Sequence, residues 1–170
     1  MSEEYTQLVE GCKNRERRAM KRLYDLTAPM AIGVCMRYSH DRDAAQDLMQ
    51  EGYIKVYEGI GKLRDPSKVM AWVYQVMVNE CINRCKRAKR TEYIEEMVTE
   101  PVVFQPDTFA GEEVVMKLQL LPPRPRAVFN MLEVEELTEE EAAARLKTSV
   151  GNVRTLMSRA KRMLREMLTK

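Results

Sequence analysis

Residues 137–165, LTEEEAAARLKTSVGNVRTLMSRAKRMLR, constrain the fold most, because they predict two helices joined by a tight turn. Thr138 is a favourable N-cap, and Glu141 follows it at the spacing of a capping box. Residues 147–148 form the expected turn, and Ser149 is placed to cap the second helix.

The second helix is amphipathic at a period of about 3.6 residues. Its apolar face is formed by Val150, Val153, Met157, Ala160, Leu164 and Met167. Its other face is small, polar or basic and holds Gly151, Thr155, Ser158, Arg159, Arg162 and Arg165. This pattern is typical of a helix-turn-helix, whose second helix enters the DNA major groove. A solvated helical hairpin fits the same pattern, but the basic face favours nucleic acid.

The net charge of +2 hides a strong segregation of charge along the 170 residues. One basic cluster lies at residues 84–90 and another runs from Arg154 to the C-terminus, whereas residues 92–141 are heavily acidic. Two basic segments around an acidic one indicate two contacts with a polyanion. The alternative is that both are solvated helix ends, where the helix dipole favours cations.

The composition, 45% hydrophobic and 32% charged, is typical of a helix-rich globular chain. No apolar run reaches the length of about 18 residues that suggests a membrane span. The acidic N-terminus lacks the apolar core of a signal peptide, so we expect a cytoplasmic protein. Cys81 and Cys85 share a helix face and could supply two metal ligands, but the only histidine is His40. We therefore expect buried, reduced thiols and neither a metal nor a cofactor.

A helix predicted over residues 41–58 carries an acidic stripe opposite its apolar face. Its polar side gathers Asp43, Asp47, Gln50 and Glu51. Such a stripe is either solvated surface or a docking face for a basic partner.

The next predicted helix, from about residue 67 to 88, has a stripe with an aromatic residue, amides and cations and no acid. Its members are Lys68, Trp72, Gln75, Asn79, Asn83, Lys86 and Arg90. Amides and cations bind phosphates and base edges, and an aromatic ring stacks on an unpaired base. For Trp72 we favour packing in the core, because large aromatic side chains dominate core burial. For Asn79, Asn83 and the cations we favour a role at the surface.

Residues 91–112 contain prolines and acids without a sustained period, which predicts an interdomain linker. Helical patterns lie on both sides, one of them over residues 124–133, and no strand pattern occurs. We therefore predict an all-α protein of two small helical domains joined by a flexible linker. The predicted domains are residues 1–91 and 113–170, and the second contains the helix-turn-helix.

Four motifs in this order resemble the extracytoplasmic function (group 4) sigma factors of bacterial RNA polymerase. The run DRDAAQDLMQEGYIKVY resembles family region 2.2, and MAWVYQVMVNECINRCKR resembles regions 2.3–2.4. LPPRPRAVFNM resembles the start of region 4.1, and the helix-turn-helix resembles region 4.2. The resemblance covers residues 20–168. The sequence departs from the family at residues 63–69, where LRDPSKV replaces F-R-G-D-x-x-F.

The resemblance implies a non-enzymatic subunit that directs core RNA polymerase to promoters. It implies binding to the β′ clamp helices through Asp43, Asp47, Gln50 and Glu51, and binding to the β flap by region 4. Melting and capture of the −10 element would fall to Leu63, Arg64, Lys68, Trp72, Asn79, Asn83, Lys86, Arg87 and Arg90. Recognition of the duplex −35 element would fall to Ser149, Asn152, Arg154, Thr155, Ser158, Arg159 and Arg162. An anti-sigma factor that covers these surfaces is a further implied partner.

Two other interpretations start from the same residues. The first is a helix-turn-helix regulator with an N-terminal sensor or dimerisation domain, against which the polar amide stripe counts. The second is an enzyme. A single histidine, no Gly-rich phosphate loop and no paired catalytic carboxylates leave little from which to build its site.

Overall fold

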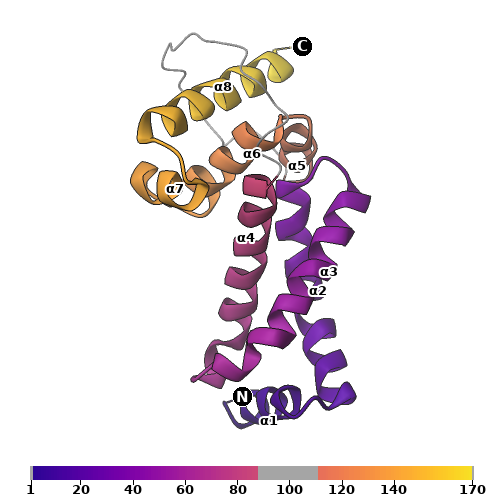
Figure 1. The fold of residues 1–170 in the computed structure, drawn as a ribbon. Coiled ribbons are helices and arrows are strands. Elements are labelled where there is room, and N and C mark those ends of the chain that lie inside the picture. The colour runs from indigo at the N-terminus through magenta and orange to yellow at the C-terminus, as the bar shows by residue number, and fades with distance from the viewer. Residues whose placement is uncertain (1, 88–110, 170) are drawn as a thin grey trace. The chain divides into compact units, whose positions relative to one another are not determined.

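The computed structural model describes residues 2–87 and 111–169, and all regular structure within them is helical (Figure 1). This confirms the predicted all-α class. The chain divides into two compact units, each packed mainly on itself. Unit 1 comprises Met1–Cys35 and Asp43–Cys81, and unit 2 comprises Met36–Arg42 and Ile82–Lys170. The domain limits drawn from the sequence differ from these bounds and stay a prediction. The predicted linker falls outside the described residues apart from 111–112, which begin a helix.

Unit 1 is built from three long helices and smaller elements. These are α1 (Ser2–Lys13), most of α2 (Arg17–Tyr38), α3 (Arg42–Gly59), the 3-10 helices η1 (Ile60–Lys62) and η2 (Pro66–Lys68), and most of α4 (Val69–Arg87). Helices α2, α3 and α4 lie side by side in Figure 1, and α1 packs against η1 and η2. Helices α3 and α4 begin and end within about two residues of the predicted limits, which is the ordinary uncertainty of helix ends.

The core of unit 1 is formed by the apolar stripes of these helices. Its fully buried members include Leu23, Ala31, Val34, Cys35, Ala45, Val56, Val69, Val73 and Met77. Each of the larger side chains contributes about 1.5–3 kcal/mol by leaving water. Pro29 lies inside α2 without ending it.

Helices α2 and α3 are also joined by polar contacts in their interface. The buried Thr27 hydroxyl lies 2.6 Å from the Tyr53 hydroxyl and donates to the Leu23 carbonyl at 2.8 Å. The Tyr57 hydroxyl donates to the Met20 carbonyl at 2.7 Å. Buried hydroxyls with partners avoid the cost of leaving a polar group unpaired, so these contacts fix how α3 lies on α2.

In the described residues of unit 2, five helical segments follow α4. They are α5 (Gly111–Gln119), α6 (Pro123–Phe129), the π-helix η5 (Asn130–Val134), α7 (Glu139–Leu146) and α8 (Val150–Leu168). The helix predicted over residues 124–133 is confirmed, although its second half is the wider π-helix. The side chain of Asn130 donates to the Arg126 carbonyl at 2.9 Å and so competes with the backbone for that acceptor.

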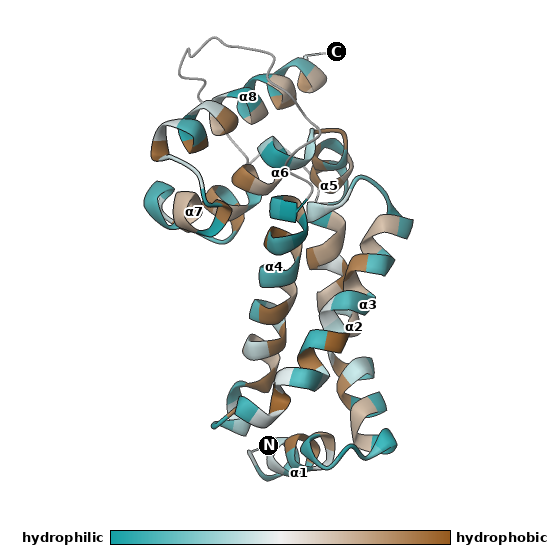
Figure 2. Ribbon diagram, viewed as in Figure 1, coloured by the Kyte–Doolittle hydropathy of each residue, from teal (hydrophilic) through white to brown (hydrophobic). Residues whose placement is uncertain are grey.

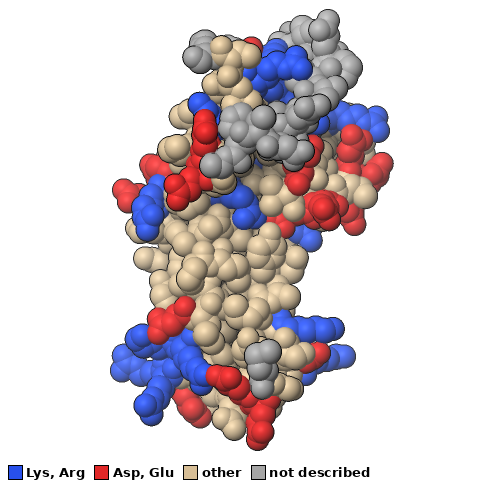
Figure 3. All heavy atoms as spheres, turned by 180° about the vertical axis from the view of Figure 1, so that it is seen from behind, with Lys and Arg blue, Asp and Glu red and all other residues tan. Residues whose placement is uncertain are grey.

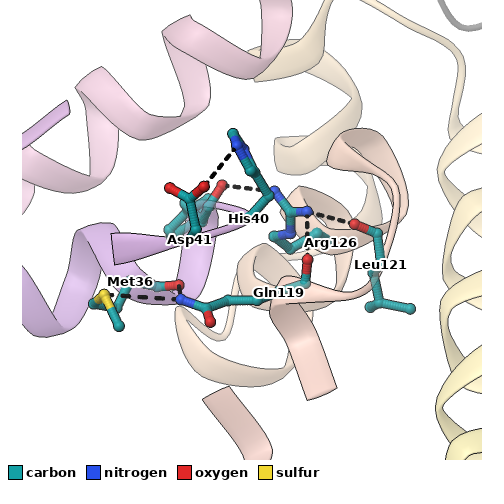
Figure 4. A network of polar contacts seen from close by, with 7 residues as sticks. Met36, His40, Asp41, Gln119, Leu121 and Arg126 are labelled. Atoms are coloured by element: carbon teal, nitrogen blue, oxygen red, sulfur yellow. Dashed lines mark hydrogen bonds and ion pairs between the residues drawn. The ribbon is translucent and has the colours of Figure 1, made fainter. Parts of the chain in front are cut away.

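A buried guanidinium holds several segments of unit 2 together. Arg126 is 4% exposed, and it donates through Nε to the Leu118 carbonyl at 3.0 Å and through Nη1 to the Tyr38 carbonyl at 3.2 Å. Its Nη2 donates to the Gln119 carbonyl at 3.0 Å and to the Leu121 carbonyl (Figure 4). Carbonyls at helix C-termini lack partners within their helix and carry partial negative charge, so one cation satisfies several of them at once.

In the described part of the chain, no helix is both long enough and apolar enough to cross a membrane. The cysteines Cys12, Cys35, Cys81 and Cys85 are buried thiols outside any disulfide, as the sequence predicted.

Candidate nucleic-acid and polymerase interface

The turn between α7 and α8 is defined by caps that the sequence predicted. The Thr138 hydroxyl accepts from the Glu141 amide at 3.1 Å, and the Glu141 carboxylate accepts from the Thr138 amide at 2.8 Å. Lys147 ends α7 in the left-handed conformation, with φ of 50°. The Ser149 hydroxyl then accepts from the Asn152 amide at 3.1 Å and starts α8. The capping box and the helix-turn-helix are confirmed.

The predicted apolar face of α8 is the side that packs into unit 2. Val153, Met157, Ala160 and Leu164 are buried, and α8 contacts α6 and α7. Val150 and Met167, at the two ends of the same face, are half-buried. Hydrophobic and hydrophilic residues alternate turn by turn along α8 (Figure 2). This packing leaves the small, polar and basic face of α8 directed away from the core.

We call the predicted duplex-binding residues on α8 and its cap the −35 surface. Ser149, Arg154, Thr155 and Arg162 are exposed, and Asn152, Ser158 and Arg159 are half-exposed. The structure therefore brings all seven onto one helix and its cap, as the motif predicted.

Some side chains of the −35 surface already make local hydrogen bonds. The Thr155 hydroxyl donates to the Gly151 carbonyl at 3.1 Å, and the Asn152 amide donates to the Thr148 hydroxyl at 2.8 Å. Ser149 acts as the cap. These contacts order the N-terminal half of α8, which is the part of a recognition helix that contacts base edges.

Sequence reasoning missed an acidic residue at the −35 surface. Arg154 Nε lies 2.6 Å from Glu139 Oε2, so the first residue of α7 contacts the first half of α8. The two residues belong to different helices, and no helical spacing relates them. The sequence shows only that Glu139 follows the N-cap Thr138. That its carboxylate reaches α8 depends on the geometry of the turn, which the sequence does not give.

We call the predicted single-strand residues on η2, α4 and the segment before them the −10 surface. Arg64 and Lys68 are exposed, whereas Leu63 is 8% exposed and belongs to the core. Lys and Arg side chains, with several Asp and Glu among them, gather at the end of unit 1 that carries α1 (Figure 3). Leu63 was assigned to the −10 surface because of its position in the motif. That assignment is wrong, because its apolar side chain is buried in the core.

Trp72 is half-buried, between the core role that we favoured and a stacking role. A Cβ added at Gly59 would lie 3.3 Å from the Trp72 ring, so the glycine lets the indole lie against the end of α3. The rest of the side chain is partly open to solvent.

The amide and cation stripe runs along the exposed side of α4. Gln75, Asn79, Asn83 and Arg87 are exposed and Lys86 is half-exposed, whereas Arg90 lies outside the described residues. The loop before α4 is ordered by Asp65, whose carboxylate accepts from the Ser67 amide at 3.1 Å and the Ser67 hydroxyl at 2.6 Å. These hydrogen bonds lower the pKa of Asp65, so the carboxylate stays charged at neutral pH.

We call the acidic stripe of α3 the docking surface. Asp43, Asp47 and Gln50 are exposed, and Glu51 is half-buried. Sequence reasoning missed Ile54, which is 57% exposed and lies one helical turn beyond Gln50. The docking surface therefore combines acidic and amide side chains with one exposed apolar residue, a composition found at protein interfaces.

The groups with strongly raised pKa values lie in unit 1, Tyr53 and Cys12 in its core and Tyr57 half-buried beside it. Burial raises the pKa of Tyr53 and of Tyr57 to about 12 and that of the Cys12 thiol to about 11. All three are therefore neutral at physiological pH. They are structural groups, and none belongs to the three surfaces defined above.

Comparison with known families matches both halves of the chain. The family model for Sigma-70 region 2 matches residues 23–91, and that for Sigma-70, region 4 matches residues 111–164. The first match covers α3 and α4 with the docking and −10 surfaces. The second covers α7 and most of α8.

Relatives of similar length carry sigma factor names. The chain is 27% identical to the RNA polymerase sigma-H factor of Pseudomonas aeruginosa, over 94% of this chain and 91% of that protein. It is 25% identical to the ECF RNA polymerase sigma factor SigW of Bacillus subtilis, over 94% of each chain.

Solved structures show the same fold. The sigma factor RpoE of Bartonella quintana, solved in complex with the anti-sigma factor NepR, superposes with a TM-score of 0.52 at 22% identity, over 88% of this chain and 96% of that one. A region 2 match across the N-terminal half disfavours a regulator with an unrelated sensor domain there. The chain belongs to the extracytoplasmic function group of the sigma-70 family, whose members direct RNA polymerase to promoters.

Proposed function

We propose that this sigma factor divides its work among the three surfaces. The docking surface binds core polymerase, the −10 surface opens and holds the downstream promoter element, and the −35 surface binds the upstream element as duplex. The observation that carries the proposal is α8, because its caps and buried stripe leave a small, polar and basic face outward.

The −35 surface suits duplex DNA in its chemistry. Small side chains at Thr155 and Ser158 let the helix approach base edges closely, and arginine binds guanine through two hydrogen bonds. Arg159 and Arg162 supply charge for bases or phosphates on the same face. Region 4 is also the part that we expect to contact the β flap.

The −10 surface suits an unpaired strand. Exposed amides at Gln75, Asn79 and Asn83 follow one another along α4, with Lys68 before them and Lys86 after them, and the stripe contains no acid in the described residues. The indole of Trp72 lies against Gly59 and is only half-buried, so its exposed part is available to stack on a base. Arg64 and Lys68 extend the cationic track before α4.

The docking surface suits a basic partner. Asp43 and Asp47 project from α3 with Gln50, and we assign them to the β′ clamp helices of the polymerase. The protein acts without chemistry of its own in this scheme, and it works in the cytoplasm, where the polymerase is. An anti-sigma factor that covers the same surfaces would keep the protein inactive.

The test of core binding is a charge reversal on α3. We expect the double variant Asp43→Lys, Asp47→Lys to lose co-elution with core polymerase, because it replaces two exposed acids that face a basic partner. The control variant Glu3→Lys, Glu10→Lys makes the same charge change at exposed positions of α1 and should co-elute normally. Equal co-elution of both variants would contradict the assignment of the docking surface.

The test of promoter recognition uses Arg159→Ala in the reconstituted holoenzyme. In transcription from a promoter library, discrimination at one −35 position should fall by about 1–3 kcal/mol, since one bidentate contact is lost. Core binding should be unchanged. Arg17→Ala, which removes an exposed arginine of α2, serves as the control and should retain the −35 preference. Loss of −10 preference in place of −35 preference would mean that the surfaces are misassigned.

A further inference from the structure

The contact between Glu139 and Arg154 joins two rigid points of the helix-turn-helix. Glu139 follows the N-cap Thr138 directly, inside the capping box. Arg154 follows Val153, whose side chain is 0% exposed and anchors that turn of α8. Because both backbone positions are fixed, the 2.6 Å contact between Glu139 Oε2 and Arg154 Nε restricts the guanidinium to a narrow range of orientations.

The contact selects which N–H groups of Arg154 remain available. An arginine can bind guanine O6 and N7 side-on, through Nε and one Nη, or end-on, through Nη1 and Nη2. Glu139 occupies Nε, so only the end-on mode is left. In the described part of the chain, no other residue forms an ion pair with the guanidinium, and the Arg154 side chain is 64% exposed.

The dipole of α7 favours an acid anywhere in its first turn, which also holds Glu140 and Glu141, so stability does not single out position 139. An exposed ion pair contributes only about 0–1 kcal/mol to folding. A carboxylate beside a DNA-binding helix also repels phosphates, which weakens binding to every sequence alike. Glu139 can change the preference among sequences only through Arg154. A paired Arg154 moves less readily to a nearby phosphate and stays oriented toward the base edges.

The other exposed arginines of this face show the contrast. Within the described residues, Arg159 and Arg162 form no ion pair, so no acidic side chain fixes which of their N–H groups face outward. Arg154 is therefore the arginine of the −35 surface whose orientation the fold imposes.

We propose that Glu139 is a specificity-determining residue, which orients Arg154 for end-on binding of a guanine in the −35 element and holds it away from phosphates. This inference rests on the proposed function of the −35 surface. Glu139 itself need not touch DNA, so it acts as a positioning residue.

The test compares Glu139→Gln with Glu140→Gln in the full-length protein bound to core polymerase. Both variants remove one negative charge from the first turn of α7, but Glu140 is exposed and makes no contact with Arg154. The probe is duplex DNA carrying a randomised −35 element, with a non-specific duplex as competitor. Both variants should bind the non-specific duplex more tightly. Only Glu139→Gln should lower the preference for guanine at the Arg154 position, by about fivefold or more.

A second arm repeats Glu139→Gln in an Arg154→Ala background, where it should have no further effect on base preference. Unchanged thermal unfolding of Glu139→Gln excludes a folding defect as the cause. If Arg154→Ala abolishes the guanine preference while Glu139→Gln leaves it intact, the role of Glu139 is overturned and the −35 surface stands. If Arg154→Ala leaves the −35 preference intact, the assignment of Arg154 fails, and the role of Glu139 fails with it.

Discussion

At the scale of single residues, the close approach of α3 and α4 depends on Gly52. A Cβ added at Gly52 would lie 2.4 Å from Met77 Sδ and 3.1 Å from Met77 Cε. Met77 is 0% exposed, so its thioether has little room to move aside. The glycine thereby sets the distance between the helix of the docking surface and the helix of the −10 surface.

We expect Gly52→Ala to lower the free energy of unfolding by about 1–3 kcal/mol, because the added methyl group overpacks the core. Denaturant unfolding followed by Trp72 fluorescence measures this change. Gly33→Ala is the matched control. Nothing lies within 4 Å of a Cβ there, so higher helix propensity should make the protein equally or slightly more stable. A harmless Gly52→Ala would show that Met77 can rearrange without cost.

The role of a single residue could be predicted where the spacing within its own helix determines that role. The surface position of Asn79 and Asn83 followed from the period of α4 and is confirmed. The burial of Leu63 did not follow, because a short irregular segment has no period that separates inside from outside. Neither did the contact between Glu139 and Arg154, which are 15 residues apart.

At the scale of elements, the orientation of α8 depends on the caps around its turn. The capping box of α7 satisfies two backbone amides reciprocally, and it fixes where the helix starts. The same start places Glu139 beside α8. A change in the cap should therefore alter the position of Glu139 relative to the −35 surface.

We expect Thr138→Ala to destabilise unit 2 by about 1 kcal/mol, since the Glu141 amide loses the hydroxyl that accepts from it. Thermal unfolding followed by far-ultraviolet circular dichroism is the measurement. Thr155→Ala removes a threonine from the exposed side of α8 and should change stability by less than about 0.5 kcal/mol. An equal loss in both variants would mean that the cap contributes nothing beyond helix propensity.

At the scale of the whole molecule, groups that destabilise the fold at high pH are concentrated in unit 1. Burial raises the pKa of Tyr53 and Tyr57 from 10.0 to about 12, and that of Cys12 from 9.0 to about 11. Their stabilising effect is complete below their unfolded pKa values. It is lost as pH rises through the folded values, since the unfolded chain releases these protons first.

We therefore expect unit 1 to lose stability steeply between about pH 9 and pH 12. Trp72 is the only tryptophan and lies in unit 1, so its fluorescence reports that unit, while ellipticity reports both units. Tyr53→Phe removes one titrating group together with its contact to Thr27. It should be less stable at neutral pH but less sensitive to alkali. The expectation fails if the alkaline slope is the same in both proteins.

Local patterns were sufficient for most of this protein. Helix limits, the capping box, the amphipathic face of α8 and the order of four motifs follow from spacings of three or four residues and from residue types. Such interactions act within one helix turn, so the sequence by itself determined the all-α class, the helix-turn-helix and the family.

Only the tertiary structure decided features that join distant residues. Arg126 bonds carbonyls from separate segments of unit 2, and the close packing of α3 on α4 places Gly52 against Met77. The pairing of Arg154 with Glu139 belongs with these features. Each depends on the angle at which two helices meet, which results from packing of complete side chains and has no local signature. The small, polar and basic stripe of α8 was therefore predictable from the sequence, whereas the orientation of its Arg154 side chain was not.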